Sequence, residues 1–405
     1  MIRTPEPSDG LIGGLDDAIR AALDRLWGVL PDARLVGGAV RDLLAGRPVS
    51  DIDLATPEPP ERVLELLSAS GIKVVATGIA HGTVTAVIAR RPFEITTLRE
   101  DTETDGRHAR VAWTADWRAD AARRDFTINS LFLDRNGAVH DFFGGAADLR
   151  DGVVRFVGEA GRRIEEDGLR ILRFFRFQAR YGRGAPDREA TEAIASRLYC
   201  LDRLSAERVW SELSRLLGGA APGKTLCLMQ DTGVLPALLP GAHLDPALRL
   251  DRDGAPADAL LRLAALAGGN GGWAGAVASR LKLSRDEARR LAALVETEPA
   301  EALGTDEDSL RRRLADAPAA IVLGRSWLSG ESDTVRARIA SIVPPVFPLA
   351  GRDAVQAGLK PGPEVGRLLA ETRLWWWSGG CRADRPACLG RLLTLAGEAG
   401  LLPAA

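Results

Sequence analysis

Several residue classes are scarce in this sequence, and each scarcity excludes a class of protein. The 405 residues include only four cysteines, four histidines and two tyrosines. The cysteines have no C-x-x-C spacing, so the sequence offers no cysteine zinc site. No run approaches the ~18 uninterrupted apolar residues of a membrane-spanning helix, and the first ten residues lack the apolar stretch of a secretion signal. We expect a soluble, cytoplasmic protein with no membrane contact and no obligate protein partner.

Lysine is also scarce. Four of the 53 basic residues are lysines, so arginine supplies the other 49, and the formal net charge is −2. This arginine-rich composition is also what a GC-rich genome produces. The overall charge therefore neither requires nor excludes nucleic acid, and an RNA-binding face has to be local. The 46% apolar and 27% charged residues are ordinary for globular chains, and the length corresponds to two or three domains.

The pattern of the chain changes near Asp151. Before this residue, β-prone runs separated by glycine and proline predict strands at 33–36, 51–55, 73–77, 83–89, 93–98 and 130–133. After it, apolar residues at helical spacing predict helices at 161–181, 188–199, 205–217, 256–267, 284–297, 307–314, 332–342 and 363–372. The expected fold class is α+β, with a mixed α/β head followed only by helices. We expect three domains: a head over 1–150, a helical neck over 151–218, and a helical body and tail over 219–405.

The strongest chemical signal is LVGGAVRDLLAGRPVSDIDLAT over residues 35–56. A strand leads into Gly37 and Gly38, whose small size lets a ligand approach the backbone, and then into a short helix whose N-terminus suits a triphosphate. Arg41 lies one turn into this helix, where its guanidinium can reach a phosphate oxygen. Asp51 and Asp53 follow, and residues two apart in a strand face the same side. Because two adjacent carboxylates need a cation between them, we expect them to bind Mg²⁺ together with substrate phosphates.

A second signal is EEDGLRILRFFRF over residues 165–177. Asp167 and Arg170 are three apart and are expected to share one helix face. An aspartate acceptor beside an arginine donor can pair with the amino group and the ring acceptor of cytosine, and with those of adenine. Uracil and guanine present their donors and acceptors in the opposite order, so a buried Asp–Arg pair discriminates against these two bases. An ordinary surface salt bridge on a charged helix is the alternative.

More arginines accompany these two signals. Between Gly161 and Arg183 there are seven arginines and three acidic residues, and Arg173 and Arg176 continue the stripe toward the expected phosphates. Such a cationic strip suits a triphosphate or an RNA end, although a solvated helix face is the usual alternative. The segment RRDFTIN (123–129) adds Arg124, whose orientation Asp125 can fix.

Two features of the head complete the candidate site. Glu94, in FEITTLR, is a third carboxylate that can complete the metal shell or activate the RNA 3′-hydroxyl, and a structural role at a strand end is equally open. Residues 99–113 are polar, contain glycine and lack a regular pattern, so we expect a mobile loop, which suits a lid.

These motifs together resemble a known family. GG-x-V-RD followed by D-x-D resembles the DNA polymerase β-type nucleotidyltransferase superfamily. The further motifs RRDFTIN, DFFGGAADL (141–149), EEDGLRILRFFRF and SAERVWSEL (205–213) make the chain similar to class II tRNA CCA-adding enzymes and bacterial poly(A) polymerases. The resemblance covers residues 34–240 in the family's motif order and continues more loosely over 351–369.

The resemblance implies a function for each part. It implies Mg²⁺-dependent, template-independent addition or repair of the tRNA 3′-terminal CCA from CTP and ATP, with two metal ions on Asp51 and Asp53. It also implies a base-selecting template at Asp167 and Arg170, a nucleotide contact at Arg124, and a loop at 99–113 needed for the final A. The alternatives are a poly(A) polymerase, an enzyme that adds only the terminal A, a small-molecule nucleotidyltransferase, and an inactive tRNA-binding module.

Overall fold

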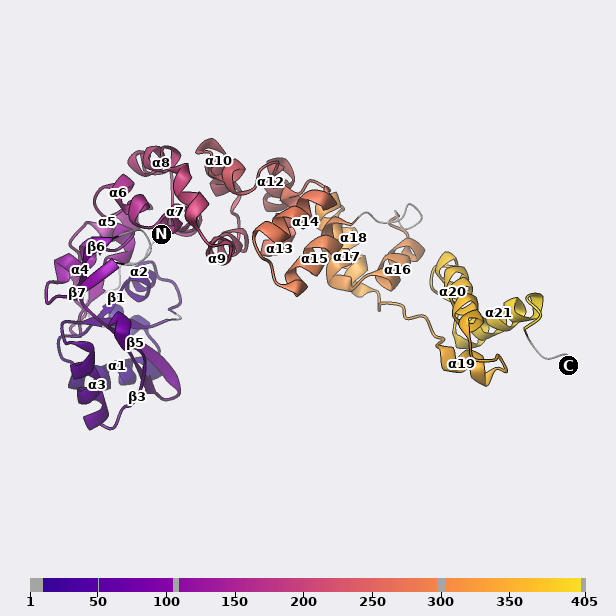
Figure 1. The fold of residues 1–405 in the computed structure, drawn as a ribbon, viewed down its shortest axis with the longest axis horizontal. Coiled ribbons are helices and arrows are strands. Elements are labelled where there is room, and N and C mark those ends of the chain that lie inside the picture. Colours follow the sequence, from indigo (N-terminus) through magenta and orange to yellow (C-terminus); the bar gives the residue numbers. More distant parts are fainter. Residues whose placement is uncertain (1–9, 50, 105–108, 297–303, 402–405) are drawn as a thin grey trace. The chain divides into compact units, whose positions relative to one another are not determined.

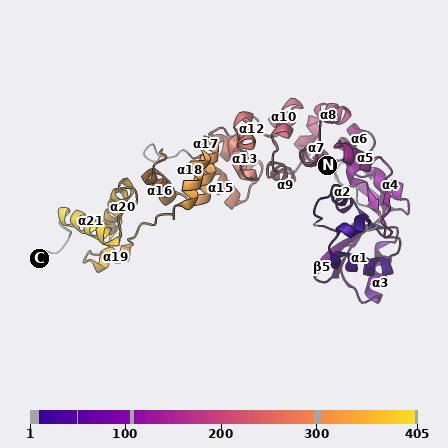
Figure 2. The same ribbon diagram turned by 180° about the vertical axis from the view of Figure 1, so that it is seen from behind.

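The computed structural model describes residues 10–49, 51–104, 109–296 and 304–401. The chain divides into two compact units, Met1–Pro240 and Gly241–Ala405 (Figures 1 and 2). Within the described residues every strand precedes Asp151 and the elements after it are helices, which confirms the expected α+β class. The domain boundaries at 150 and 218 stay predictions. Across the described ranges, no helix combines the length and the apolar character needed to cross a membrane.

A mixed sheet forms the centre of the head. In the described residues seven strands pair in the order β3-β4-β5-β2-β1-β8-β9. β2 runs parallel to β5, and the other pairs in this order are antiparallel. Each of the six predicted strands overlaps an observed strand of this sheet, and β9 was missed. The bounds are β1 Arg34–Val36, β2 Asp53–Thr56, β3 Lys73–Gly78, β4 Thr83–Ile88, β5 Arg91–Thr97, β8 Phe132–Leu133 and β9 Val139–His140.

Helices α1 (Asp17–Val29) and α3 (Pro60–Ala69) bury their apolar sides in the same core as the sheet. Leu23 and Leu26 of α1 are fully buried there with Leu35 of β1 and Leu54 of β2. Burying a leucine contributes about 1.5–3 kcal/mol, so this packing holds β1 and β2 firmly. The turns at the ends of these two strands carry the Gly-Gly and D-x-D motifs.

Residues 99–113 do not form the irregular loop that the sequence predicts. They contain two antiparallel strands, β6 (Arg99–Thr104) and β7 (Ala109–Trp113), paired apart from the main sheet, while 105–108 lie outside the described residues. β6, with the sequence REDTET, contains only polar residues, so it lacks the apolar–polar alternation that identifies a half-buried strand. The prediction of an irregular loop was therefore wrong over these strands, and its mobility remains untested.

The predicted helix over 161–181 is interrupted. α6 (Ala160–Glu166) ends before Asp167, whose backbone is extended at φ −154° and ψ 104°, and α7 (Leu169–Tyr181) begins after Gly168. An Oδ1 atom of Asp167 accepts a hydrogen bond from the backbone N–H of Leu169 at 3.1 Å. A Cβ on Gly168 would lie 2.6 Å from the carbonyl oxygen of Cys200. Asp167 and Arg170 therefore do not share one helix face.

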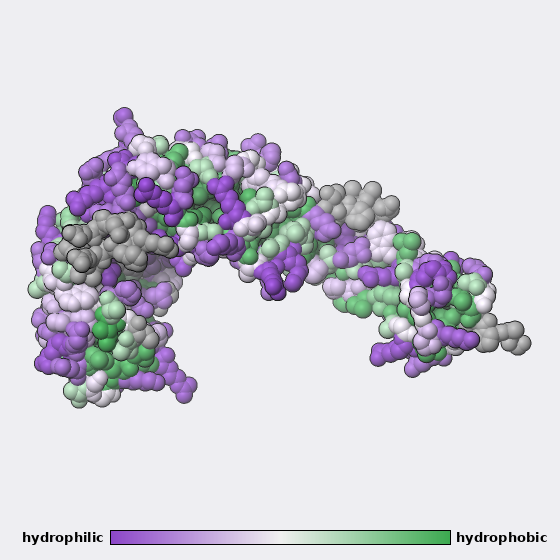
Figure 3. Space-filling view, in the orientation of Figure 1, coloured by the Kyte–Doolittle hydropathy of each residue, from purple (hydrophilic) through white to green (hydrophobic). Residues whose placement is uncertain are grey.

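Further helices complete the two units. Those of the first unit are α2 Gly38–Leu44, α4 Trp117–Ala122, α5 Gly145–Asp151, α8 Arg188–Ala195, α9 Ala206–Leu217, α10 Gly223–Asp231 and α11 Val234–Leu238. Those of the second are α12 Leu244–Arg252, α13 Ala259–Leu266, α14 Gly271–Arg280, α15 Arg285–Val295, α16 Glu307–Asp316, α17 Ala319–Ser329, α18 Asp333–Ser341, α19 Gly351–Gln356, α20 Pro363–Ser378 and α21 Arg385–Glu398. Hydrophobic residues reach the surface near α19–α21 (Figure 3), where Leu374 and Trp375 are exposed.

Candidate active site

A polar cavity of about 610 Å³ lies in the first unit, a volume suited to a nucleotide-sized ligand. All predicted site residues except Glu94 line it. The lining consists of Val36, Gly37, Gly38, Arg41, Asp51, Asp53, Arg123, Arg124, Asp125, Asn129, Asp167, Arg170, Arg173, Arg176, Phe177 and Arg215. The D-x-D motif (Asp51 and Asp53) and the Asp167–Arg170 motif, more than a hundred residues apart in the sequence, thus line the same cavity.

The Gly-Gly turn lets side chains approach the backbone at the start of α2. Gly37 has a positive φ of 63°, which an L side chain rarely adopts. A Cβ there would lie 3.4 Å from Nη1 of Arg124 and 3.5 Å from the carbonyl oxygen of Asn129. Glycine at this position therefore serves both the turn and the close packing of Arg124.

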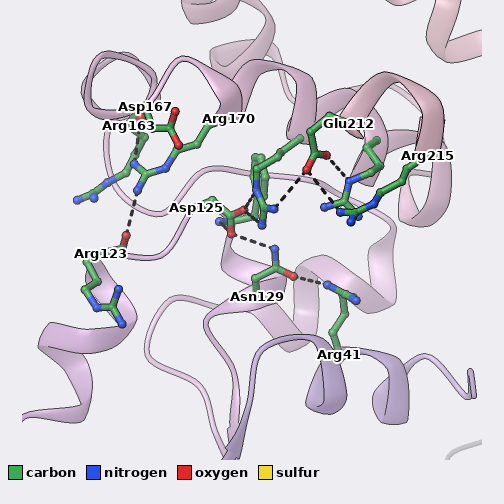
Figure 4. A network of polar contacts seen from close by, with 12 residues as sticks. Arg41, Arg123, Asp125, Asn129, Arg163, Asp167, Arg170, Glu212 and Arg215 are labelled. Carbon is green, nitrogen blue, oxygen red and sulfur yellow. Dashed lines mark hydrogen bonds and ion pairs between the residues drawn. The ribbon is translucent and has the colours of Figure 1, made fainter. Parts of the chain in front are cut away.

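Arg41 is held more firmly than the sequence indicates. Its side chain is only 9% exposed, and its Nη1 donates to Oδ1 of Asn129 at 2.5 Å (Figure 4). Its other nitrogens contact Asp42 at 3.2–3.3 Å, and its guanidinium lies 4.5 Å from the centre of the Tyr181 ring. These contacts hold the Arg41 guanidinium in the cavity wall, and its contact with a phosphate oxygen stays a prediction.

Three carboxylates lie close together near the start of β2. Asp53 begins β2 and stands in register with Glu94 of the parallel strand β5, about one strand spacing of 4.8 Å away. Asp51 precedes β2 and lines the cavity beside Asp53. Desolvation, followed by the negative charges of Glu94 and Asp51, raises the pKa of Asp53 to about 6, although Arg124 acts in the opposite direction. A bound cation would offset this clustered negative charge, and Asp51 and Asp53 stay the predicted metal ligands.

The donor set fits a hard divalent cation that shares its shell with a substrate. In the described part of the chain no group of three or more His, Cys, Asp or Glu side chains has metal-binding geometry. The cavity therefore supplies Asp51 and Asp53, and the remaining ligands have to come from substrate and water. Mg²⁺ is commonly bound in this way, through one or two carboxylates plus substrate phosphates.

Asp167 and Arg170 reach the cavity from different sides of the α6–α7 break. Glu166 accepts hydrogen bonds from Arg163 and Arg170 through Oε2, each at 2.7 Å. Arg170 also donates to the carbonyl oxygen of Arg123 at 3.3 Å. Oδ2 of Asp167 accepts from Arg208 of α9 at 2.7 Å. These contacts fix an acceptor and a donor at one end of the cavity.

Asp120 fixes the two arginines of RRDFTIN. This carboxylate is 1% exposed and accepts from Arg123 at 2.7 Å and from Arg124 at 2.8 Å. It also accepts from the backbone N–H of Arg99, the first residue of β6, at 3.2 Å. Although burial acts in the opposite direction, the two guanidiniums lower the pKa of Asp120. The predicted orienting residue, Asp125, instead contacts Arg173.

A hydrogen-bonded network continues from α2 to α9 (Figure 4). Asn129 donates to Asp125 at 2.9 Å, and Asp125 accepts from Nε of Arg173 at 2.7 Å. Glu212 of α9 is 5% exposed; it pairs with Arg176 at 2.5 Å and, more loosely, with Arg173 at 3.7 Å. Despite burial, the carboxylates of Asp125 and Glu212 raise the pKa of Arg173. Arg173 and Arg176 therefore line the cavity as held cations.

The sequence reasoning missed the contribution of α9. Its apolar side, with Val209, Leu213 and Leu216, is buried, while Arg208, Glu212 and Arg215 recur at i, i+4 and i+7 on another face. Residues at these spacings lie on one side of a helix. The signal was present in SAERVWSEL and the residues after it. Nothing in the sequence alone shows that this side faces the cavity.

Comparisons with known proteins agree with this geometry. Residues 33–155 match the family described as "Poly A polymerase head domain", and residues 185–245 match "Probable RNA and SrmB- binding site of polymerase A". The chain is 38% identical over 377 residues to the mouse (Mus musculus) "CCA tRNA nucleotidyltransferase 1, mitochondrial", covering 88% of this chain and 86% of that protein. It is 40% identical over 223 residues to the "CCA-adding enzyme" of Geobacillus stearothermophilus, covering 54% of each chain.

A solved structure extends the likeness to nearly the whole chain. The Bacillus stearothermophilus CCA-adding enzyme, crystallised in complex with CTP, superposes with a TM-score of 0.76 at 26% identity, covering 95% of this chain and 99% of that chain. The Thermotoga maritima CCA-adding enzyme, solved with tRNA, superposes with a TM-score of 0.68 at 21% identity, covering 95% and 97% of the two chains. At that identity the second likeness shows the fold alone.

Proposed function

Since the chain belongs to the CCA tRNA nucleotidyltransferase and bacterial poly(A) polymerase family, we propose that it adds or repairs the 3′-terminal CCA of tRNA. The substrates are CTP, ATP and the tRNA 3′ end, and the product besides the extended RNA is pyrophosphate. The observation that carries this proposal is the single cavity in which the D-x-D carboxylates meet Asp167 and Arg170. The relatives that match across most of the length are named for CCA addition, which favours this activity over poly(A) synthesis.

The reaction joins the RNA 3′ oxygen to the α-phosphorus of the nucleotide and breaks the bond from that phosphorus to pyrophosphate. The family uses divalent metal ions, and we propose Mg²⁺ on Asp51 and Asp53, where it supplies charge stabilisation for the attacking and leaving oxygens. In this proposal Arg124, Arg173 and Arg176 bind the triphosphate beside the Gly37–Gly38 turn. Holding both reactants in line lowers the barrier without a covalent intermediate.

Base selection is assigned to Asp167 and Arg170. A fixed acceptor next to a fixed donor pairs with the amino group and ring acceptor of cytosine or adenine, and leaves groups unpaired against uracil or guanine. Glu166 and Arg208, which hold this pair at 2.7 Å each, support the assignment. We propose that the negative charge of Glu94 helps to raise the pKa of Asp53. Unchanged turnover in a Glu94→Gln variant would rule out a catalytic role for Glu94.

One extension experiment tests the proposal. Three tRNA transcripts, ending before CCA, after C and after CC, are incubated with CTP, ATP or both, and products are resolved at single-nucleotide resolution. We expect extension that stops at CCA and disappears in an Asp51→Ala/Asp53→Ala variant. A long A-ladder indicates a poly(A) polymerase, a single A on the CC-ended transcript alone indicates an A-adding enzyme, and no extension contradicts catalysis.

We also propose a cellular location for the protein. We expect the chain to act in the cytoplasm, where tRNA precursors need a 3′ end, while three matching relatives are named as mitochondrial. Fractionation of the cells that express the protein tests this expectation.

A further inference from the structure

Arg215 differs from every other arginine that lines the cavity. It lies in the last turn of α9 and its side chain is 62% exposed. The side chains of Arg41, Arg123, Arg124, Arg170, Arg173 and Arg176 are between 9% and 32% exposed. Arg215 therefore stands at the mouth of the cavity, while the others form its walls.

The charge of Arg215 is also the least compensated of its group. Asp125 and Glu212 pair closely with Arg173 and Arg176, at 2.5 Å each. Arg215 reaches Glu212 only at 3.8 Å, which is too long for a hydrogen bond. Three guanidiniums thus share two carboxylates, and one positive charge remains for an external anion. Burial lowers the pKa of Arg176, and the nearby cations Arg173 and Arg215 act in the same direction.

The proposed contacts of the nucleotide leave Arg215 unused. In the close-up view, Arg215 lies at the opposite end of the network from Asp167 and Arg170, which are assigned to the base (Figure 4). The triphosphate is assigned to the Gly37–Gly38 turn and the wall arginines. An exposed cation at the mouth is placed to meet a strand that enters from solvent.

We propose that Arg215 binds a backbone phosphate of the RNA strand whose 3′ end enters the cavity. This inference rests on the proposed function and adds a residue that positions the RNA rather than the nucleotide. The interaction is a charge-assisted contact between guanidinium and phosphate, which a point charge from lysine can partly replace.

The test measures RNA and nucleotide binding separately in the full-length protein. In Arg215→Ala we expect the Kd and KM for a CC-ended tRNA transcript to rise about fivefold to tenfold, with the KM for ATP changed less than about twofold. The slope of log Kd against log salt should fall by about 0.7–0.9, as for one lost phosphate contact. Arg215→Lys should recover most of the affinity.

Arg62→Ala is the matched control. Arg62 lies on α3 in the same unit, its side chain is 54% exposed, and it pairs with Glu65 at 3.1 Å, so the variant loses one surface arginine that does not line the cavity and lies outside residues 185–245. We expect native Kd, KM and salt slope.

Two outcomes overturn the inference. A raised KM for ATP with unchanged tRNA affinity places Arg215 on the triphosphate, and unchanged values for both substrates show that it contacts neither. Because tRNA Kd is measured by filter binding without nucleotide, it reports on Arg215 even in a protein that adds no CCA. Failure of the unmodified protein to extend tRNA contradicts only the proposed function.

Discussion

At the scale of single residues, the site depends on charges that the fold forces together. Asp53 is the clearest case, because it stands beside Glu94 in register and beside Asp51 in the cavity. Its pKa of about 6 lies above the ordinary 3.8. The folded protein therefore holds this proton more tightly than the unfolded chain does. The associated stability is fully present below about pH 4 and is lost as the pH rises through about 6.

Asp53→Asn should therefore separate stability from activity. In metal-free buffer at pH 8 we expect the variant to melt about 1–3 °C above the native protein, because one of three clustered charges is removed. The difference should shrink as the pH falls from 8 to about 4, because Asp53 of the folded protein becomes protonated over this range. Nucleotide addition should fall by at least about 10³-fold. Differential scanning fluorimetry and the tRNA extension assay measure the two effects, and a destabilised variant at pH 8 contradicts the electrostatic account.

Metal binding should follow the same ionisation. When Mg²⁺ and CTP are added together, we expect a rise in melting temperature at pH 7.5 that is lost near pH 5. The cause is protonation of Asp53, whose pKa is about 6 without metal. Asp51→Ala/Asp53→Ala should show no Mg²⁺-dependent rise at either pH. A rise of equal size at pH 5 and 7.5 excludes Asp53 as a ligand.

At the scale of elements, α9 holds the α6–α7 segment in place. Glu212 is buried between arginines of α7, and Arg208 contacts Asp167. Glu212→Gln leaves Arg173 and Arg176 with one carboxylate fewer, so we expect a loss of about 1–3 kcal/mol in the free energy of unfolding. The KM for CTP should rise because the wall arginines lose their fixed positions. Urea unfolding and steady-state kinetics measure the two effects. If the free energy of unfolding and the KM for CTP both stay at native values, Glu212 does not hold Arg173 and Arg176 in place.

The β6–β7 hairpin is attached to the sheet near Gly82. This glycine has φ 80°, and a Cβ on it would lie 2.5 Å from the ring of Trp113 at the end of β7. Arg99 at the start of β6 donates to the carbonyl oxygen of His81 at 2.9 Å. Gly82→Ala should displace the hairpin base and slow addition of the terminal A about tenfold or more, with a smaller effect on C addition.

Gly137→Ala is the matched control for this prediction. Gly137 has nearly the same φ, 81°, but a Cβ there meets nothing within 4 Å. The two variants share the backbone strain and differ in the contact with Trp113. Single-turnover addition of A to a CC-ended transcript compares them, and equal rates show that the Trp113 contact does not matter.

At the scale of the whole molecule, we expect the first unit to bind the nucleotide and the second unit to contribute to tRNA binding. The cavity is lined entirely by residues of the first unit, which has its own hydrophobic cores. A chain ending at Pro240 should therefore fold and still be stabilised by CTP with Mg²⁺. Its KM for tRNA should rise at least about tenfold, because we expect the lost helices to contact tRNA phosphates at a distance from the 3′ end. Native tRNA affinity in the truncated chain assigns the second unit no RNA-binding role.

The sequence by itself determined six strands of the head's main sheet, the helical remainder and the residues of the D-x-D and Asp167–Arg170 motifs. These features are local, since spacing and residue type suffice to recognise them. Their meeting in one cavity, the interruption at Asp167 and the pairing of 99–113 into strands were decided by the tertiary structure. Asp167 leaves the helix because Gly168 packs against Cys200, and Arg215 becomes a cavity residue because α9 packs on α7. Such contacts join distant parts of the chain, and no local pattern encodes them.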